Sequence, residues 1–230
     1  MRLRLPEERP AEPPTGFKIA HALVSQDGSR AGFTGVSLGG ALPYGVVADA
    51  ECVYGLRHRA PHRRCDCGFH CVHERAVAEG LLCTAEHRRA VLLEVAVLGA
   101  FIRYERGFRF ARQRVRVVTV GACACGREAG GLADAGWGRE GWRALAPVCT
   151  GCVGARAVLS LAGFARLAGS GVRVRAGEGR GGDEASVPGG RFGVPELVAE
   201  AALLQARLDW FQTQLGRLGE PGAEEPRGRG

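Results

Sequence analysis

Two groups of cysteines constrain the fold of this chain more than any other feature of its sequence. Eight of its nine cysteines lie in two short stretches, residues 52–71 and residues 123–152. Thiolates and imidazoles at such close spacing are the ligands that hold Zn²⁺ in tetrahedral sites. The 230-residue chain is 46% hydrophobic, so it can also bury a core of its own. The sequence therefore predicts a globular protein that binds two zinc ions per chain.

The second group predicts a structural zinc site. Its ligands form two close pairs, Cys123-x-Cys125 and Cys149-x-x-Cys152, and a glycine follows each pair. Two short turns that face each other in this way supply four thiolates at Zn–S distances of about 2.3 Å. A redox or iron–sulfur role is one alternative for these cysteines, and unliganded buried thiols are another. A centre closed by four thiolates leaves no position for a substrate.

The first group predicts another zinc site, with more than one candidate ligand set. Cys65-x-Cys67-Gly68 repeats the turn of the second group, and we expect Cys52 and His58 to supply the remaining ligands. Other side chains compete for these positions, namely His62, His70, Cys71 and His73. The surplus residues are alternatively part of the core or solvated. Cys83 lies outside both groups and is interpreted as a small buried apolar group.

Only the first site leaves room for an enzyme. If a water molecule replaced His58 as a ligand, Glu51 or Asp66 could act as a base in zinc-dependent hydrolysis. The sequence contains no P-loop, no G-x-S-x-G elbow, no HExxH and no dinucleotide fingerprint. We therefore expect a protein without catalytic residues, and a zinc-dependent enzyme is the alternative.

The first cysteine group also carries a family resemblance. Residues 58–68 read His58-x-Ala60-Pro61-x-x-x-Cys65-x-Cys67-Gly68, which resembles a motif of uncharacterised actinobacterial proteins. In that family a Val-rich strand and an Arg- and Gly-containing segment follow, here residues 94–99 and 103–109. The resemblance spans residues 17–120 and implies a shared module but no activity. Residues 68–71 and the strands after them are also similar to ADP-ribosyltransferase-like folds, which implies a transferase as a further enzyme alternative.

Hydrophobic patterning predicts an α+β protein. Short strands are expected at residues 17–23 and 91–97, a hairpin turn at 105–107, and helices at 74–89 and 155–168. The predicted parts are a disordered tail at 1–15, a β-rich zinc-binding domain at 16–120 and a zinc-ribbon-like module with a helix at 121–175. A flexible linker at 176–193, an amphipathic helix at 194–218 and a disordered tail at 219–230 complete the list.

Arginines supply nearly all of the positive charge of this chain, whose net charge is +7 and whose pI is about 9.2. Some surround the first metal site and others, Arg109 among them, line the strands that follow. Because arginine binds phosphates and aromatic rings stack on bases, the sequence predicts a nucleic-acid-binding face. Its residues are Arg57, Arg59, Arg63, Arg64, Arg112, Arg114 and Arg116. Alternatively, the aromatic residues belong to the core and the arginines form a solvated face.

The last helix shows apolar residues at spacings of three and four, which is typical of a short coiled coil. The residues expected to bind a partner protein, or a second copy of the chain, are Leu197, Leu204, Leu208, Phe211 and Leu215. Alternatively, this face packs on the protein's own body.

The N-terminal segment predicts a cytoplasmic protein that does not enter a membrane. It lacks the apolar stretch of about 7–15 residues that a secretory signal requires. Thiols stay reduced in the cytoplasm, so clustered cysteines indicate metal binding rather than disulfides. Taken together, we expect a zinc-binding adaptor or regulatory protein that contacts nucleic acid or the transcription machinery. A protein–protein scaffold is the alternative among binding functions.

Overall fold

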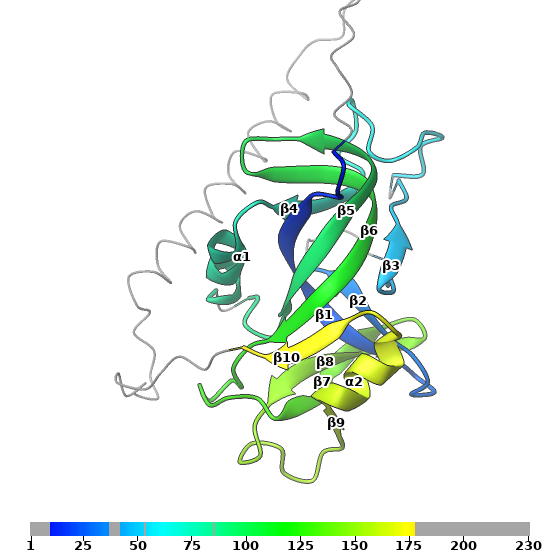
Figure 1. Ribbon diagram of the computed structural model, residues 1–230. Coiled ribbons are helices and arrows are strands. Elements are labelled where there is room, and N and C mark those ends of the chain that lie inside the picture. The colour runs from blue at the N-terminus through cyan, green and yellow to red at the C-terminus, as the bar shows by residue number, and fades with distance from the viewer. Residues whose placement is uncertain (1–9, 37–41, 53, 85, 178–230) are drawn as a thin grey trace, which may run out of the picture. The chain divides into compact units, whose positions relative to one another are not determined.

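The computed structural model describes residues 10–36, 42–52, 54–84 and 86–177, and all elements below lie in these ranges (Figure 1). They are mostly β-structure with two short helices. The strands are β1 (Thr15–Ser25), β2 (Ala31–Gly35), β3 (Val47–Asp49), β4 (Phe69–Val72), β5 (Val91–Arg103), β6 (Gly107–Val120), β7 (Gly131–Arg139), β8 (Trp142–Val148), β9 (Val158–Ser160) and β10 (Arg173–Ala176). The helices are α1 (Arg75–Leu82) and α2 (Leu161–Ala168).

The β5–β6 hairpin is the longest feature of the sheet (Figure 1). Valine and leucine dominate β5, and such residues favour a pleated, buried surface. The amide of Tyr104 donates a hydrogen bond of 2.8 Å to the carbonyl of Gly107, which closes the predicted turn. Gly99 has a φ of +69° and lies where the register shifts between Leu98 and Phe101. Gly99 thus marks an irregularity in the pairing of this strand.

One ten-stranded sheet joins the segments on both sides of residue 120. β1 pairs with β4 and β5, and both of these pair with β6, so that these strands form a closed circuit of pairings. β8 also pairs with β1, from Ala22 opposite Leu145 to Ser25 opposite Trp142. β10 adds to β6 in parallel. The strands of the expected module at 121–175 are therefore continuous with the sheet of the domain at 16–120.

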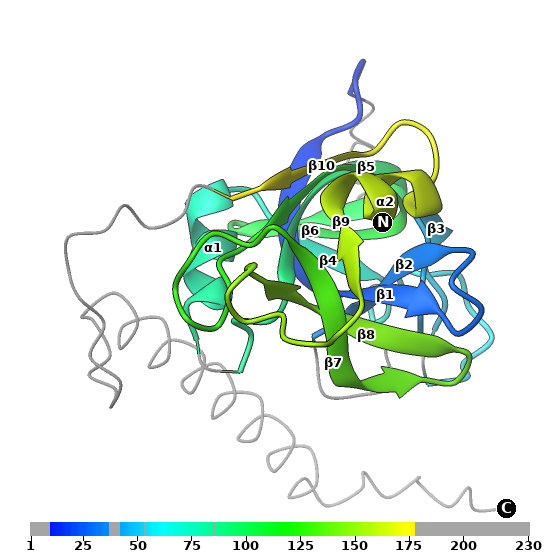
Figure 2. The ribbon, with the colours of Figure 1, turned by 90° about the horizontal axis from the view of Figure 1, so that it is seen from below.

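The two helices cover different faces of the sheet (Figures 1 and 2). Phe164 of α2 is fully buried and its ring centre lies 5.9 Å from that of Phe33 in β2, in the main core. α1 instead covers Ile19 and Leu92, which form a smaller cluster with Ala78. Alternate residues of β1 and β5 therefore serve the two clusters, as the two-residue period of a strand requires.

Both helices are shorter than the sequence pattern predicts. The prediction of a helix at 155–168 is wrong over its first part, because residues 158–160 form β9 and α2 begins only at Leu161. Ser160 caps α2 through its hydroxyl, which accepts a 3.0 Å hydrogen bond from the amide of Gly163. α1 ends at Leu82, where Cys83 and Thr84 turn back onto the carbonyls of Gly80 and Leu81. Gly80 weakens the helix that the pattern continues to residue 89.

The predictions for the two ends of the chain fall largely outside the described residues. These are most of the linker at 176–193, the amphipathic helix at 194–218 and both predicted tails except residues 10–15. Within the described part of the chain, no helix is long and apolar enough to cross a membrane.

Candidate metal centres

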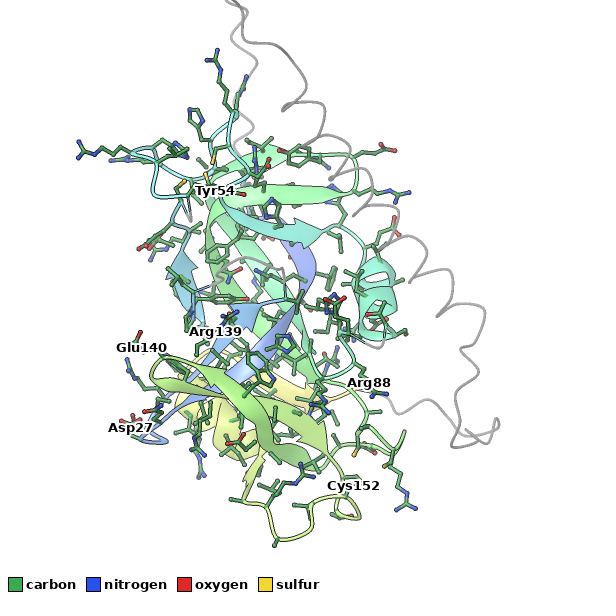
Figure 3. The ribbon with its side chains drawn as sticks, turned by 180° about the vertical axis from the view of Figure 1, so that it is seen from behind. Asp27, Tyr54, Arg88, Arg139, Glu140 and Cys152 are labelled. Atoms are coloured by element: carbon green, nitrogen blue, oxygen red, sulfur yellow. The ribbon has the colours of Figure 1, made fainter. Side chains whose placement is uncertain are left out.

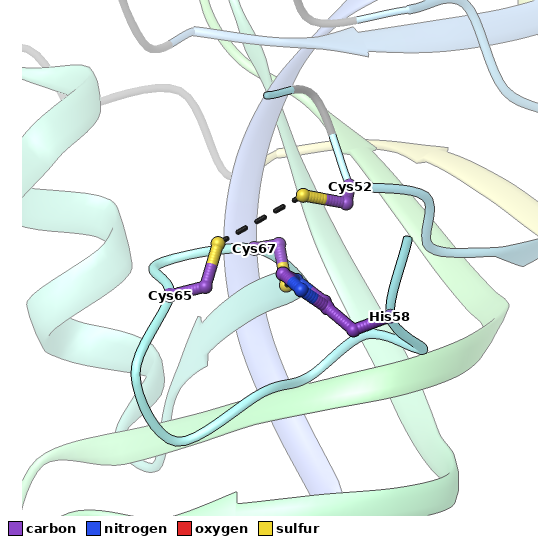
Figure 4. A group of neighbouring side chains, drawn as sticks. All are labelled: Cys52, His58, Cys65 and Cys67. Carbon is purple, nitrogen blue, oxygen red and sulfur yellow. Dashed lines mark hydrogen bonds between the residues drawn. The ribbon is translucent and has the colours of Figure 1, made fainter. Parts of the chain in front are cut away.

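The first cluster brings together the four side chains that the sequence proposed as ligands (Figure 4). Their sulfur and nitrogen atoms all lie within 4.8 Å of one another. The sulfurs of Cys52 and Cys65 are 3.8 Å apart, and Nε2 of His58 lies 3.2 Å from the sulfur of Cys67. A tetrahedral ion with Zn–S distances of about 2.3 Å separates its sulfurs by about 3.8 Å. The arrangement therefore fits one metal ion bound by three thiolates and an imidazole.

A buried arginine holds the loop that carries this cluster. Arg109 of β6 is only 4% exposed, and its guanidinium donates hydrogen bonds to the carbonyls of Cys65 and, at 3.2 Å, of His62. It also lies 3.5 Å from the carboxylate of Asp66. The sequence pattern predicted only that Arg109 lines a strand and did not indicate this role. Alternation along β6 offered no clue, because Phe108, Arg109 and Phe110 are all buried.

Gly68 explains why a glycine follows the cysteine pair of the first cluster. Its φ is +124°, a conformation that favours glycine. A β-carbon at this position would lie 3.0 Å from Cγ of Arg109 and 3.3 Å from Cβ of Pro61. The backbone therefore passes close to the arginine that holds the loop, and only glycine fits without displacement.

The competing histidines and cysteine have other roles in the structure. Cys71 is buried in the main core rather than in the cluster. The Nε2 atom of His73 lies 3.0 Å from the carbonyl oxygen of Tyr104. The ring of His62 stacks on that of His58 with 4.5 Å between centres, and His70 is exposed on β4. Cys83, interpreted as buried, is only partly so, and its thiol donates to the carbonyl of Glu79.

The second cluster brings the two predicted cysteine pairs face to face. The four sulfurs lie within 4.8 Å of one another, and those of Cys125 and Cys149 are 3.5 Å apart. Each pair lies on a turn: the amide of Gly126 donates to the carbonyl of Cys123 at 2.8 Å, and that of Cys152 donates to that of Cys149 at 3.1 Å. Gly126 has a φ of +86°, which favours glycine at the end of this turn. The arrangement fits one metal ion with four thiolate ligands.

The thiols of the second cluster have divergent pKa values. Burial raises the pKa of Cys123, but the amides of Cys125 and Cys149 donate hydrogen bonds that outweigh it, and the pKa falls to about 6. Burial is likewise outweighed at Cys149, whose pKa is lowered by hydrogen bonds with Cys125 and Cys152. The sulfur of Cys125, followed by those of Cys149 and Cys123, raises the pKa of Cys152 to about 12. Four close sulfurs cannot all ionise together unless a cation compensates their charge.

The first cluster shows the same conflict in weaker form. Burial acts to raise the pKa of Cys52, but hydrogen bonds from the amides of Tyr54 and Leu56 outweigh it and the pKa is lowered. At Cys67 burial dominates and raises the pKa. A divalent cation would stabilise the thiolate form of both residues. In each cluster the donor atoms, their spacing and their electrostatics thus suit a metal ion.

The four loop arginines of the first centre are all exposed, which both a binding face and a solvated face require. They are Arg57, Arg59, Arg63 and Arg64. Two apolar side chains project beside them, since Tyr54 is 63% and Leu56 is 55% exposed. Tyr54 lies at one end of the sheet in Figure 3, whereas Cys152 of the second centre lies at the other.

The arginines of β6 alternate with buried residues. Arg112 and Arg114 are exposed, whereas Gln113 and Val115 are fully buried between and beyond them. Arg116 is partly buried, and its Nη1 lies 3.5 Å from the hydroxyl of Thr15. Arg112 is 3.7 Å from the carboxylate of Asp49, so part of its charge is already compensated. The aromatic residues Phe108 and Phe110 nearby belong to the core.

A separate polar group lies within the main sheet. The Lys18 ammonium lies over the ring of Phe69 at 4.8 Å and that of Tyr44 at 5.1 Å, and 3.4 Å from Oε1 of Gln113. Burial lowers the pKa of Lys18 to about 8, although the Cys71 thiol partly offsets this effect. Burial also raises the pKa of Tyr44. The interior therefore disfavours the charged form of Lys18, which is the only lysine of the chain.

Comparison with family models, with curated proteins and with solved structures yields no match to this chain. The resemblance of residues 58–68 to an actinobacterial family therefore stays a prediction.

Proposed function

We propose that this protein is a zinc-stabilised nucleic-acid-binding protein without catalytic activity. Both centres would hold Zn²⁺, because thiolate-rich tetrahedral sets suit that ion. With His58 as a ligand the first centre is closed, which leaves no position for the water that a zinc hydrolase requires. Asp66, one of the two candidate bases, lies 3.5 Å from Arg109.

The observation that carries this proposal is the basic loop of the first centre. Its exposed arginines lie between or beside metal ligands, so a bound ion would fix their backbone at both ends of the loop. Such preorganisation reduces the entropy cost of binding a ligand. The exposed Tyr54 offers a ring on which a base can stack, and the arginines offer forks for phosphates. Single-stranded nucleic acid is the ligand class that suits both features.

Salt-dependent binding tests the proposal. Fluorescence anisotropy of labelled single-stranded and duplex oligonucleotides would be measured with the zinc-loaded full chain between about 50 and 200 mM salt. If four arginines each contact a phosphate of a single strand, affinity should fall about 50-fold over this range. No binding at the lowest salt would refute the nucleic-acid function and favour a protein-binding scaffold.

Charge-matched variants locate the face. Arg63→Gln combined with Arg64→Gln should weaken binding and reduce the slope of log affinity against log salt by about 1.4. Arg139→Gln combined with Arg166→Gln removes the same charge from exposed positions elsewhere and should leave the slope unchanged. Equal effects of the two pairs would show attraction by net charge alone, which contradicts a defined face.

The predicted helix at 194–218 supplies the second part of the proposal, an adaptor role. Its apolar seam would bind a partner protein or a second copy of the chain. Sedimentation of the full chain and of a variant with Leu204→Asp and Leu208→Asp tests self-association directly. If both proteins are monomers, the expected partner is a different protein. Affinity capture with the full chain and with the variant would then test whether binding of that protein requires the apolar seam.

A further inference from the structure

A hollow of about 190 Å³ lies beside the second metal centre. Small and apolar residues such as Ala146, Pro147 and Val148 form much of its wall, together with Cys123 and Cys152 of the centre itself. Three arginines from two separate segments complete the lining, namely Arg88, Arg89 and Arg156. Figure 3 shows Arg88 and Cys152 in the same region of the molecule. This volume exceeds what a single water molecule needs, so it can admit a small anion.

Arg156 is oriented by the turn that carries the cysteines. Its Nε donates to the carbonyl of Val153 at 3.2 Å, and its Nη2 donates to that of Cys152 at 2.6 Å. These bonds hold the guanidinium against the metal turn, and Nη1 has no partner among the residues that the structure describes, so it can donate to a ligand. A group held in this way loses little entropy when it binds an anion.

Arg88 and Arg89 lie on a turn that is also fixed. The amide of Arg88 donates to the carbonyl of Thr84 at 3.0 Å, and that of Ala90 donates to the carbonyl of His87 at 2.8 Å. Both arginines are exposed, and neither has an acidic partner within the described part of the chain. Their forks are thus available to a ligand.

The charge around the hollow favours an anion. Of the described residues in its lining, Asp134 is the one acidic residue, and Arg143 lies 3.6 Å from that carboxylate. A zinc ion with four thiolates carries a formal charge of about −2, so the three lining arginines together with Arg143 exceed the centre and Asp134 by one positive charge. Arginine forks match the geometry of phosphate oxygens.

We propose that this hollow is a phosphate-binding site, formed by Arg88, Arg89 and Arg156 around the second metal centre. Its ligand is a phosphate group, either as the free anion or as a phosphodiester of a nucleic-acid strand. The site is independent of the basic loop of the first centre, because no residue of that loop lines it.

Titration calorimetry of the zinc-loaded full chain with inorganic phosphate, at low salt, tests the site. The double variant Arg88→Gln with Arg89→Gln should weaken phosphate binding at least tenfold, and so should Arg156→Gln. Arg166→Gln, at an exposed position of α2, should change it less than twofold. Zinc content would be measured for every variant, because Arg156 also contacts the metal turn. The structure shows no hydrogen bond from the side chains of Arg88 and Arg89 to the metal turn. The phosphate affinity of the double variant therefore remains interpretable even if Arg156→Gln loses zinc.

A parallel titration with a labelled oligonucleotide separates the two sources of phosphate. Phosphate binding that the double variant weakens supports a site for the free anion. Failure to bind inorganic phosphate, together with an oligonucleotide affinity that the double variant lowers tenfold, supports a phosphodiester. If neither titration responds to the double variant, the arginines serve only as counter-ions of the thiolates and the proposal is overturned. Variants of Arg63 and Arg64 test the first face, so the two proposals can fail separately.

Discussion

Replacing Lys18 by methionine should stabilise the protein at neutral pH, and the gain should disappear as the pH rises. The Lys18 pKa falls from 10.5 to about 8 because the ammonium is buried. A lysine with a lowered pKa in the folded state binds its proton less tightly there than in the unfolded chain. Unfolding therefore takes up a proton between about pH 8 and pH 10.5, so stability rises with pH across that window.

The shift sets the size of the effect. Each pKa unit corresponds to about 1.4 kcal/mol, so a lowering from 10.5 to about 8 destabilises the folded state by about 3 kcal/mol below pH 8. This figure is an upper limit, because part of the Lys18 side chain stays exposed. Between pH 7 and pH 10.5, the stability difference between Lys18→Met and the wild type should shrink by about 2–3 kcal/mol.

Denaturant unfolding of both proteins at several pH values measures that difference. Titrating groups that do not interact with Lys18 occur in both proteins and cancel. Cys71 does interact with Lys18, but its pKa of about 11 places its titration mostly above this pH range. Arg166→Met, at an exposed site on α2, serves as a control whose difference from the wild type should not depend on pH. A Lys18→Met difference that stays constant from pH 7 to pH 10.5 would refute the assignment of a desolvated ammonium.

Further predictions concern the metal centres and the core. Removing the metal with a strong chelator should destabilise the fold by several kcal/mol, seen in denaturant unfolding, because structural zinc binds zinc-finger peptides with apparent free energies of about 10–16 kcal/mol and this binding is coupled to folding. Cys149→Ser should lower the zinc content from two ions to one in native mass spectrometry, whereas the control Cys83→Ser should keep both. Arg109→Met leaves two loop carbonyls without their donor and should cost about 1–3 kcal/mol of stability and weaken zinc binding at the first centre, whereas the exposed Arg106→Met should do neither. Phe164→Ala should destabilise by about 3–5 kcal/mol, since its ring is fully buried.

Local spacing explains why the metal-centre residues could be proposed in advance. Cys65 and Cys67, or Cys149 and Cys152, lie on one turn each, so their proximity follows from the chain itself. The β5–β6 hairpin was also accessible, because its strands and turn are consecutive and its valines alternate or cluster as buried strands do. Spacing alone could not separate His58 from its competitors as a ligand. The structure separates them, because Cys71 is buried in the core and His73 contacts the carbonyl of Tyr104.

The helix predictions failed where tertiary contacts decided between helix and strand. Residues 158–160 pair with β7, from Gly131 opposite Ser160 to Ala133 opposite Val158, and this pairing overrides the helical pattern of 155–168. The continuity of the sheet across residue 120 likewise depends on β1 and β8, which are distant in sequence. A division of the chain by composition cannot detect such pairs.

The sequence by itself thus determined which donor atoms form the two clusters, because ligand types and their short spacings act within single turns. Only the tertiary structure decided what surrounds them. Arg109 reaches the first loop from 44 residues along the chain, and the 86–90 turn meets the second centre across the hollow. Contacts between distant segments depend on strand pairing and core packing over the whole domain. Short-range sequence patterns do not specify either of these.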